Sequence, residues 1–443
     1  MNEPDYLKNA TPVPQNQRAA WFKNIAPAYA GIILWFVFWQ DIVKTGTLGG
    51  GLINGIALPV ISLVVAGLVA YALFYLPSAL FGMKTGFGLA IVGNSLFGKL
   101  GGVFMPGLFM GILQFGWLGV NIYFASLLIC ETLTFIPLWL MIVIEGVLAA
   151  FVAFKGIKYV AGISTWLPLI PLVVLILMLA KTLPTVCDFT PEVFEKFAST
   201  SAPALSGFGI FSFVMTYVIG FFATAGAAGA DFGTSARGKK DVHLGGFFGI
   251  CLSIILTGTA AILIIAGAYA NPEILAKLSE NQMCATQLLS AVLGDNLGKT
   301  CMFLLAVSAF PSACFACLIA ANSFKTLLPK VNATLSVSCG AAAAILLALT
   351  GVAGKAAAVF GFIGASFGPI CGAIMAEYFL RKGEWKSSDV AYNPAGWIAW
   401  AIGFIVGVAN NFGVNIPLAP VVAFVVGFVV YIIAAKIFRS ANK

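Results

Sequence analysis

Long apolar segments, separated by short polar connections, follow one another along the whole chain. Each is long enough for an α-helix to cross a hydrocarbon core, which takes about 20 residues. We predict twelve such helices, at 24–46, 52–80, 101–128, 133–154, 158–181, 204–228, 243–269, 298–324, 334–352, 355–380, 395–414 and 416–438. Composition agrees, since 60% of the residues are apolar and only 9% are charged. The pattern predicts an all-α, multi-pass membrane protein.

The distribution of basic residues predicts the orientation, because loops rich in Lys and Arg stay on the cytoplasmic side. If both tails and the even-numbered connections are cytoplasmic, 18 of the 24 Lys and Arg residues fall on that side. The exceptions are Lys44, Lys181, Lys196, Lys277, Lys299 and Lys355. The first 20 residues are polar and do not read as a signal peptide. We therefore expect an inner (cytoplasmic) membrane protein whose net charge of +8 suits anionic lipid headgroups rather than nucleic acid.

The reactive side chains argue against an enzyme. The single histidine, His243, follows a basic run at a helix start, so histidine triads and multi-histidine metal sites are excluded. Nine cysteines show no metal-ligand spacing, and the Cys314 and Cys317 pair lies inside a predicted span. Cys187 and Cys284 fall in predicted external loops, which would allow a disulfide that the sequence alone does not establish. We expect no catalytic residues and no cofactor.

Polar residues inside the predicted spans mark a candidate transport path. In the first span, Gln40 and Asp41 follow an apolar run at 25–38. A carboxylate at that depth costs roughly 2.5–3.5 kcal/mol on insertion scales, so it usually faces a cavity or a partner. The others are Gln114, Asn121, Glu145, Thr224, Ser308 and Ser312. Hydrogen bonding between helices explains isolated Ser and Thr equally well, and Glu145 reads as a buried or interfacial carboxyl.

Two spans contain helix-weakening runs of small residues. The first span ends in a glycine-rich stretch at 46–51, and the sixth contains Ala, Gly and Thr at 223–230. Their separation by five spans suggests two inverted five-helix repeats, in which broken helices supply backbone groups to a midplane site. Close helix packing is the alternative explanation of the small residues. The predicted divisions are an N-terminal tail 1–23, repeats at 24–181 and 204–380, two additional helices at 395–438 and a tail 439–443.

Short motifs make the identification more specific. They are Thr-Pro-Val-Pro-Gln at 11–15, Thr-Gly-Thr-Leu-Gly-Gly-Gly-Leu at 45–52, Gln-Phe-Gly-Trp-Leu-Gly at 114–119, Thr-Ala-Gly at 224–226 and Ala-Asp-Phe at 230–232. Together they resemble bacterial cytosine permeases of the nucleobase-cation symporter family, also called the purine/cytosine permease family. The resemblance extends over nearly the whole chain, including 334–337 and 376–378.

This resemblance implies the leucine-transporter fold, with 5+5 inverted repeats plus two helices. It also implies a symporter that imports a nucleobase or related small nitrogen heterocycle with Na+ by alternating access. Trp117 and Phe222 match the family's stacking positions. Gln114 lies three residues before Trp117, on the same helix face, and its amide can read a ring edge. Gln40 is a further candidate for such a contact.

Thr224 and Ser308 complete the expected substrate-binding set. For the ion, carbonyls of Phe38 and Trp39 would join the hydroxyls of Ser308 and Ser312, because Na+ favours oxygen ligands. The eighth-span run at 308–315 keeps only those two hydroxyls where the relatives have an Asn-rich run with adjacent threonines. Compared with those relatives, this chain therefore has fewer side-chain amides in the eighth span, and it has the amide of Gln40 in the first span.

Asp41 admits three interpretations. It binds a cationic ligand or helps to hold Na+, it carries a proton, or it pairs with Lys44. The alternative function is accordingly a proton-coupled or uncoupled carrier of another heterocycle, such as a vitamin precursor or a hydantoin-like compound. A channel would need a continuous polar pore, whereas the polar groups here are sparse. The expected partners are the heterocycle, Na+ or H+ and the lipid bilayer, and the working expectation is a monomer.

Overall fold

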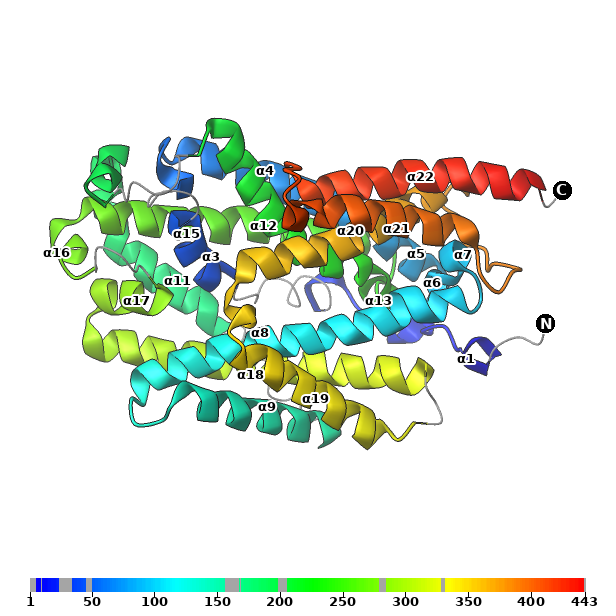
Figure 1. Cartoon of the computed structure of the whole chain (residues 1–443), viewed down its shortest axis with the longest axis horizontal. Coiled ribbons are helices and arrows are strands. Elements are labelled where there is room, and N and C mark those ends of the chain that lie inside the picture. Colours follow the sequence, from blue (N-terminus) through cyan, green and yellow to red (C-terminus); the bar gives the residue numbers. More distant parts are fainter. Residues whose placement is uncertain are drawn as a thin grey trace.

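The computed structural model describes residues 5–8, 10–23, 34–44, 50–155, 167, 169–197, 205–278, 284–327 and 331–441. In these ranges the chain is helical, and the only β-type pairing is a single parallel bridge between Ala19 and Ala236. The long helices run side by side, roughly along the longest axis of the molecule (Figure 1). The α1 helix (Asp5–Lys8) and the C-terminal end of α22 (Ala419–Ala441) lie at the same end.

The predicted spans are confirmed as helices. Ten continuous helical segments of the described chain are long and apolar enough to cross a membrane. They cover Ala57–Thr85, Val103–Thr132, Leu138–Lys155, Leu169–Asp188, Gly207–Ala227, Lys239–Ala270, Asp295–Ala321, Ala356–Leu380, Pro394–Phe412 and Ala419–Phe438. The shorter helices α3 (Leu34–Lys44) and α19 (Ala333–Leu349) lie within the predicted first and ninth spans. Each of the twelve predicted ranges therefore contains helix.

Several spans are built from more than one helical element. The second comprises α4 (Ala57–Val69), the π-helical η4 (Ala70–Tyr75) and α5 (Leu76–Thr85), and the third comprises the π-helical η5 (Val103–Leu108) and α8 (Phe109–Thr132). The seventh comprises α14 (Lys239–Gly246), the π-helical η8 (Phe247–Leu252) and α15 (Ser253–Ala270). The remaining spans are α9 (Leu138–Lys155), α11 (Leu169–Thr182) with η6 (Leu183–Asp188), α12 (Gly207–Ala227), α18 (Asp295–Leu327), α20 (Ala356–Leu380), α21 (Pro394–Val408) with η10 (Ala409–Phe412), and α22.

Short elements fill the connections. They are η1 (Gln15–Gln17), η2 (Trp21–Lys23), η3 (Gly50–Leu52), α6 (Leu89–Val92), α7 (Asn94–Phe97), η7 (Pro191–Phe197), α13 (Gly229–Thr234), α16 (Pro272–Leu275), α17 (Ala285–Leu293) and η9 (Val352–Gly354). The predicted external segments therefore contain short helices rather than separate domains. Cys187 and Cys284 both carry free thiols, and Cys284 Sγ lies 3.0 Å from Thr286 Oγ1, so the suggested disulfide is not formed.

Two groups of helices form the interior. In one, α8 packs along α18, and both contact α9 and α19 (Figure 1). Some of the buried side chains of these four helices form a hydrophobic cluster separate from the main core, and the others belong to the main core. In the other, α12 packs against α4 and α20, while α20 also contacts α21 and α22. The central elements α3, α8, α12 and α20 position the candidate site between these groups.

The sixth span breaks where the small residues predict it. The α12 helix ends at Ala227, and α13 begins at Gly229. The turn is closed by the amide of Ala228, which donates to the carbonyl of Thr224 at 2.8 Å. In the first span, α3 continues as a helix through Asp41 to Lys44, and residues 45–49 of the glycine-rich stretch lie outside the described residues. Only the end of that stretch, in η3, is described.

Candidate functional site

A stripe of half-buried side chains runs along α8, a helix that is otherwise largely buried. It contains Gln114, Trp117 and Asn121, spaced so that they share one helix face. The Asn121 side chain donates to the carbonyl of Trp117 at 2.8 Å, so it is held by its own helix. Among the described residues, the hydrogen-bond partner of the Gln114 side chain is the Met110 sulfur at 3.7 Å, a weak acceptor. The Gln114 amide thus keeps hydrogen-bonding capacity next to the Trp117 ring.

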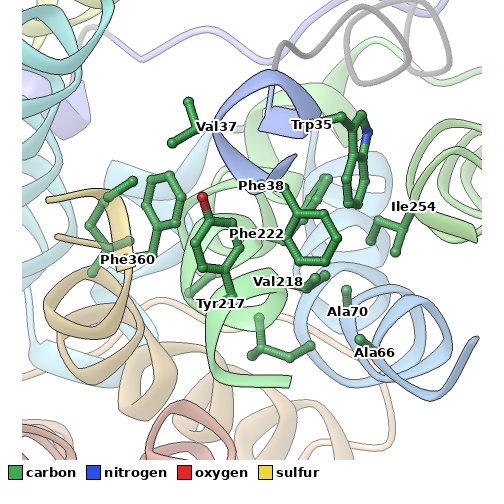
Figure 2. Close-up of a cluster of buried hydrophobic side chains, with 14 of the residues drawn as sticks. Trp35, Val37, Phe38, Ala66, Ala70, Tyr217, Val218, Phe222, Ile254 and Phe360 are labelled. Carbon is green, nitrogen blue, oxygen red and sulfur yellow. The ribbon is translucent and has the colours of Figure 1, made fainter. Parts of the chain in front are cut away.

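Aromatic side chains from three other elements gather around Trp117. Its ring centroid lies 4.9 Å from that of Phe221 on α12, edge-on, and 5.6 Å from that of Phe360 on α20. Phe360 in turn contacts Tyr217 at 5.0 Å, and Tyr217 contacts Phe38 of α3 at 5.4 Å. Figure 2 shows Phe360, Tyr217 and Phe38 in a row below α3. We call Phe38, Trp117, Tyr217, Phe221 and Phe360 the aromatic cluster.

Phe222, the expected stacking partner, lies in the interior beside this cluster. It is only 3% exposed, whereas the adjacent Phe221 is half-buried. Its ring contacts Phe221 at 5.1 Å, and Figure 2 places it close to Phe38 and Tyr217. In the part of the chain that the structure describes, the ring partners of Trp117 are Phe221 and Phe360. The structure therefore adds these two residues to the candidates for stacking.

The α3 helix contributes polar groups to the same region. Gln40 and Asp41 are both half-buried. The Asp41 carboxylate lies close enough to the Tyr217 hydroxyl to interact with it electrostatically, and Figure 2 shows this hydroxyl pointing toward α3. Within the described residues the hydroxyl completes no hydrogen bond of standard length and angle. The alternative partner of Asp41, the side chain of Lys44, lies outside the described residues.

The expected ion ligands are oxygens on α3 and α18. Ser308 is 5% exposed, and its hydroxyl donates to the carbonyl of Leu305 at 2.7 Å. Ser312, one helical turn later, is exposed. A hydroxyl that donates to its own helix still has lone pairs for a cation. The carbonyls of Phe38 and Trp39 lie inside α3, where a helix already uses each carbonyl for one backbone bond, so an ion would take the second lone pair.

Thr224 is buried near the break of the sixth span. Its side chain is 7% exposed and donates to the carbonyl of Phe221 at 3.3 Å, which leaves its oxygen able to accept a hydrogen bond.

Glu145 on α9 lies in the separate cluster of α8, α9, α18 and α19, and its Oε2 has no hydrogen-bond partner among the described residues. His243 is exposed at the start of the seventh span, and its Nδ1 lies 2.9 Å from the Tyr71 hydroxyl, as an interfacial polar residue would.

The sequence did not point to Phe221, Tyr217 or Phe360. Nothing local distinguishes Phe360 from the other phenylalanines of an apolar span, because its role follows from how α20 crosses α8 and α12. Tyr217 precedes the small-residue run by about two helical turns, and its hydroxyl points toward α3 in Figure 2. A polar aromatic in an apolar span, on the face that leads to Phe221, was the available signal for it.

Solved structures identify the fold. The chain resembles the inward-facing conformation of Mhp1 with a TM-score of 0.70 and 16% sequence identity, covering 97% of this chain and 93% of that one. A Na+-coupled sialic acid symporter matches with a TM-score of 0.65 and 14% identity, over 95% and 91% of the two chains. A manganese transporter of Eremococcus coleocola matches at 0.53 and 14% identity, over 98% of each chain. No curated protein sequence matches significantly.

These matches define the class of protein. The solved structures show the leucine-transporter fold, and a match to a permease family shows that the chain is a multi-pass membrane transporter rather than an enzyme. Residues 12–436 match the family model described as permease for cytosine/purines, uracil, thiamine, allantoin. The protein belongs to this permease family, as its motifs predict.

Proposed function

We propose that this protein imports a nucleobase or a related planar nitrogen heterocycle together with Na+ across the inner membrane by alternating access. The aromatic cluster with the adjacent Gln114 amide carries the proposal. A planar ring gains from stacking on aromatic faces, while an amide can both donate and accept at its edge. The family model covers heterocycle permeases, and one solved relative is a nucleobase-cation-symport-1 family transporter with bromovinylhydantoin bound.

In this proposal Trp117 and Phe222 form the stacking pair, with Phe221 and Phe360 beside them. Gln114 and Gln40 read the ring edge, and Thr224 and Ser308 add hydroxyls from the sixth and eighth spans. Such a site is mostly apolar with a few convergent polar groups, as small-molecule sites are. No single one of these residues identifies the ligand. Cytosine is the first candidate to test.

For the coupling ion, we place Na+ between α3 and α18, at the carbonyls of Phe38 and Trp39 and the hydroxyls of Ser308 and Ser312. All four are the hard oxygen ligands that Na+ favours. The second candidate is a proton carried by Asp41, because this half-buried carboxylate lies beside the Tyr217 hydroxyl next to the aromatic cluster. An uncoupled carrier of a vitamin precursor or hydantoin-like compound is the corresponding alternative function.

The proposed topology places both termini in the cytoplasm, with repeats at 24–181 and 204–380 and two further helices at 395–438. Two observations support it. The described ends of the chain lie at the same end of the molecule (Figure 1), as twelve spans require. The second and seventh spans, which are equivalent in a 5+5 repeat, both contain a π-helical segment, and these segments, η4 and η8, contact each other.

A ligand screen by thermal shift tests the proposal. The purified protein is heated with cytosine, uracil, adenine, thiamine or allantoin, in NaCl and again in choline chloride at the same ionic strength. Because a ligand that binds only the folded state raises its stability, the true ligand class should raise the melting temperature, and more strongly in Na+. A shift that is equal in both salts would count against Na+, and no shift with any heterocycle would count against the proposed ligand class.

A further inference from the structure

The segment before the first span lies across the ends of helices that are far away in the sequence. The amide of Val13 donates to the carbonyl of Gly86, just after α5, at 3.0 Å. The amide of Ala19 donates to the carbonyl of Ser235, between α13 and α14, at 2.8 Å. Gly86 has φ +72°, and a side chain there would meet Pro12. We call residues 12–21 the N-terminal strap.

Arg18 binds both sides of this junction. Its guanidinium donates to the carbonyl of Met83 in α5 at 2.7 Å and, more weakly, to the carbonyl of Ala236 at 3.5 Å. It also reaches back to the carbonyl of Val13, at 3.2 and 3.3 Å. The planar guanidinium has five N–H donors, which a lysine ammonium does not reproduce. Arg18 therefore connects the strap, α5 and the loop before α14.

Trp21 attaches the strap to the seventh span. Its backbone amide donates to Asp241 Oδ1 at 3.1 Å, and its ring stacks on Phe248 with centroids 5.0 Å apart and planes at 23°. The other oxygen of Asp241 accepts from Arg237 at 3.1 Å. Because the carboxylate is bonded on both sides, it fixes the strap relative to α14.

The elements that the strap joins already pack directly on one another. The α13 helix lies so close to α5 that a side chain at Gly82 or Gly233 would collide with backbone of the opposite helix. Asp231 of α13 accepts a hydrogen bond from the amide of Leu89 at 3.2 Å and occupies the space that a side chain at Gly88 would need. The α14 helix also contacts α5. Among the described residues, the hydrogen bonds of the strap go to this group of elements, to the strap itself or to the adjacent Lys23, and none reaches α8, α18 or α19.

We propose that the N-terminal strap is a permanent clasp that holds the ends of α5, α13 and α14 together as one body throughout the transport cycle, with Arg18 and Trp21 as its positioning residues. A latch that opens on each cycle would instead join elements that separate, and the strap joins elements with direct backbone contact. The clasp also accounts for the motif at 11–15, and the contacts of α13 with α5 and Leu89 account for the motif at 230–232; the binding site uses neither motif. Its part in transport rests on the proposed function.

Hydrogen–deuterium exchange tests the clasp without depending on any ligand. In the wild type, the amides of Val13 and Ala19 should exchange slowly, both without ligand and with Na+ and cytosine. Arg18→Ala should accelerate exchange at 83–89 and 233–241 by at least about tenfold, because several charge-assisted bonds are lost. Lys23→Ala is the matched control for a lost positive charge, and it should leave the exchange rates at 83–89 and at 233–241 unchanged. Rapid exchange of the strap in the wild type, or no effect of Arg18→Ala in a folded protein, would overturn the clasp.

A reversible cross-link distinguishes a clasp from a latch. Ala19 and Ala236 are paired across the parallel bridge, so Ala19→Cys with Ala236→Cys can form a disulfide. Uptake of radiolabelled cytosine into proteoliposomes is measured after oxidation and after reduction, with the cross-link verified by mass spectrometry. A clasp predicts rates that agree within about twofold, whereas arrest by the disulfide alone would show that the strap must detach.

Kinetics then separate positioning from ligand binding. Trp21→Ala should lower the maximal cytosine uptake rate several-fold and change KM by less than about twofold, because the strap lies outside the binding site. Phe135→Ala, which removes an exposed phenylalanine in the connection between α8 and α9, is the control and should resemble the wild type. An unchanged maximal rate in folded Trp21→Ala would refute the role in transport. If the wild type itself takes up no cytosine, the proposed ligand fails, while the exchange experiment still decides the clasp.

Discussion

Replacing Trp117 by alanine is the most direct perturbation of the proposed binding site. The ring is half-buried on α8, in contact with Phe221 at 4.9 Å and Phe360 at 5.6 Å, and adjacent to Gln114. Removal of the indole takes away one stacking surface for the ligand. It also removes the contacts that orient the other two rings.

The size of the effect follows from stacking energetics. Aromatic pairs are worth about 0.5–1.5 kcal/mol beyond the area they bury, and stacking of a nucleobase on an aromatic side chain is worth about 1–3 kcal/mol by alanine substitution. Since about 1.4 kcal/mol corresponds to tenfold in affinity, Trp117→Ala should weaken ligand binding about tenfold or more. Phe is the conservative replacement, and Trp117→Phe should recover much of that loss.

Isothermal titration of the detergent-solubilised protein with the heterocycle found by thermal shift measures this directly. The matched control is Trp400→Ala on α21, which removes an indole that stacks on Phe404 at 5.1 Å and donates to the carbonyl of Ser366 at 3.1 Å. Trp400 lies outside the proposed site, so its loss should lower thermal stability and leave affinity near that of the wild type. Unchanged affinity in folded Trp117→Ala would refute the stacking argument.

Three further predictions concern recognition, coupling and stability. Gln114→Leu should reduce uptake far more than thermal stability, because the site then leaves a ring-edge group without its partner; equal uptake by variant and wild type would contradict this role. If protons couple transport, Asp41→Asn should abolish the dependence of uptake on an imposed pH gradient. The double variant Asp41→Asn with Tyr217→Phe should then lose less uptake than the sum of the two single losses, since the two groups interact. Additive losses of uptake would show that the two groups act separately. Tyr431→Phe removes a 3.1 Å hydrogen bond to the fully buried Glu377. In a thermal unfolding assay this variant should have a free energy of unfolding lower by about 1.5–3 kcal/mol, while its ligand affinity stays unchanged. An unaltered melting temperature would count against this hydrogen bond.

The membrane-spanning architecture could be predicted because its signals are local. A span of apolar residues is recognisable wherever it occurs, since the bilayer sets its length. The break after α12 was likewise visible in the small residues before Gly229. The ends were less predictable: the second span continues to Thr85 rather than 80, and α9 starts at Leu138 rather than 133. Helix ends depend on capping and on contacts with other elements, which hydropathy does not record.

The composition of the site was only partly visible in the sequence. Trp117 and Gln114 stand out as a polar and aromatic pair on one helix face, and their proximity is a local property of α8. Phe360 lies 243 positions later, and its contact with Trp117 depends on the crossing of α8 and α20. Periodicity does not determine such crossings. The same reason applies to Tyr217 beside Asp41 and to the contact of Val13 with Gly86.

Accumulation of the identified heterocycle in proteoliposomes under an imposed Na+ gradient tests the central claim most directly. The protein is reconstituted, and uptake of radiolabelled ligand is followed with Na+ outside, with choline in its place, and with a pH gradient alone. Na+ coupling predicts transient accumulation above the external concentration only with the Na+ gradient, and the affinities for Na+ and for ligand should raise each other by the same factor. Accumulation driven by the pH gradient alone would show that protons, rather than Na+, are coupled to transport. Equilibration of the ligand without accumulation under either gradient would contradict the symporter account.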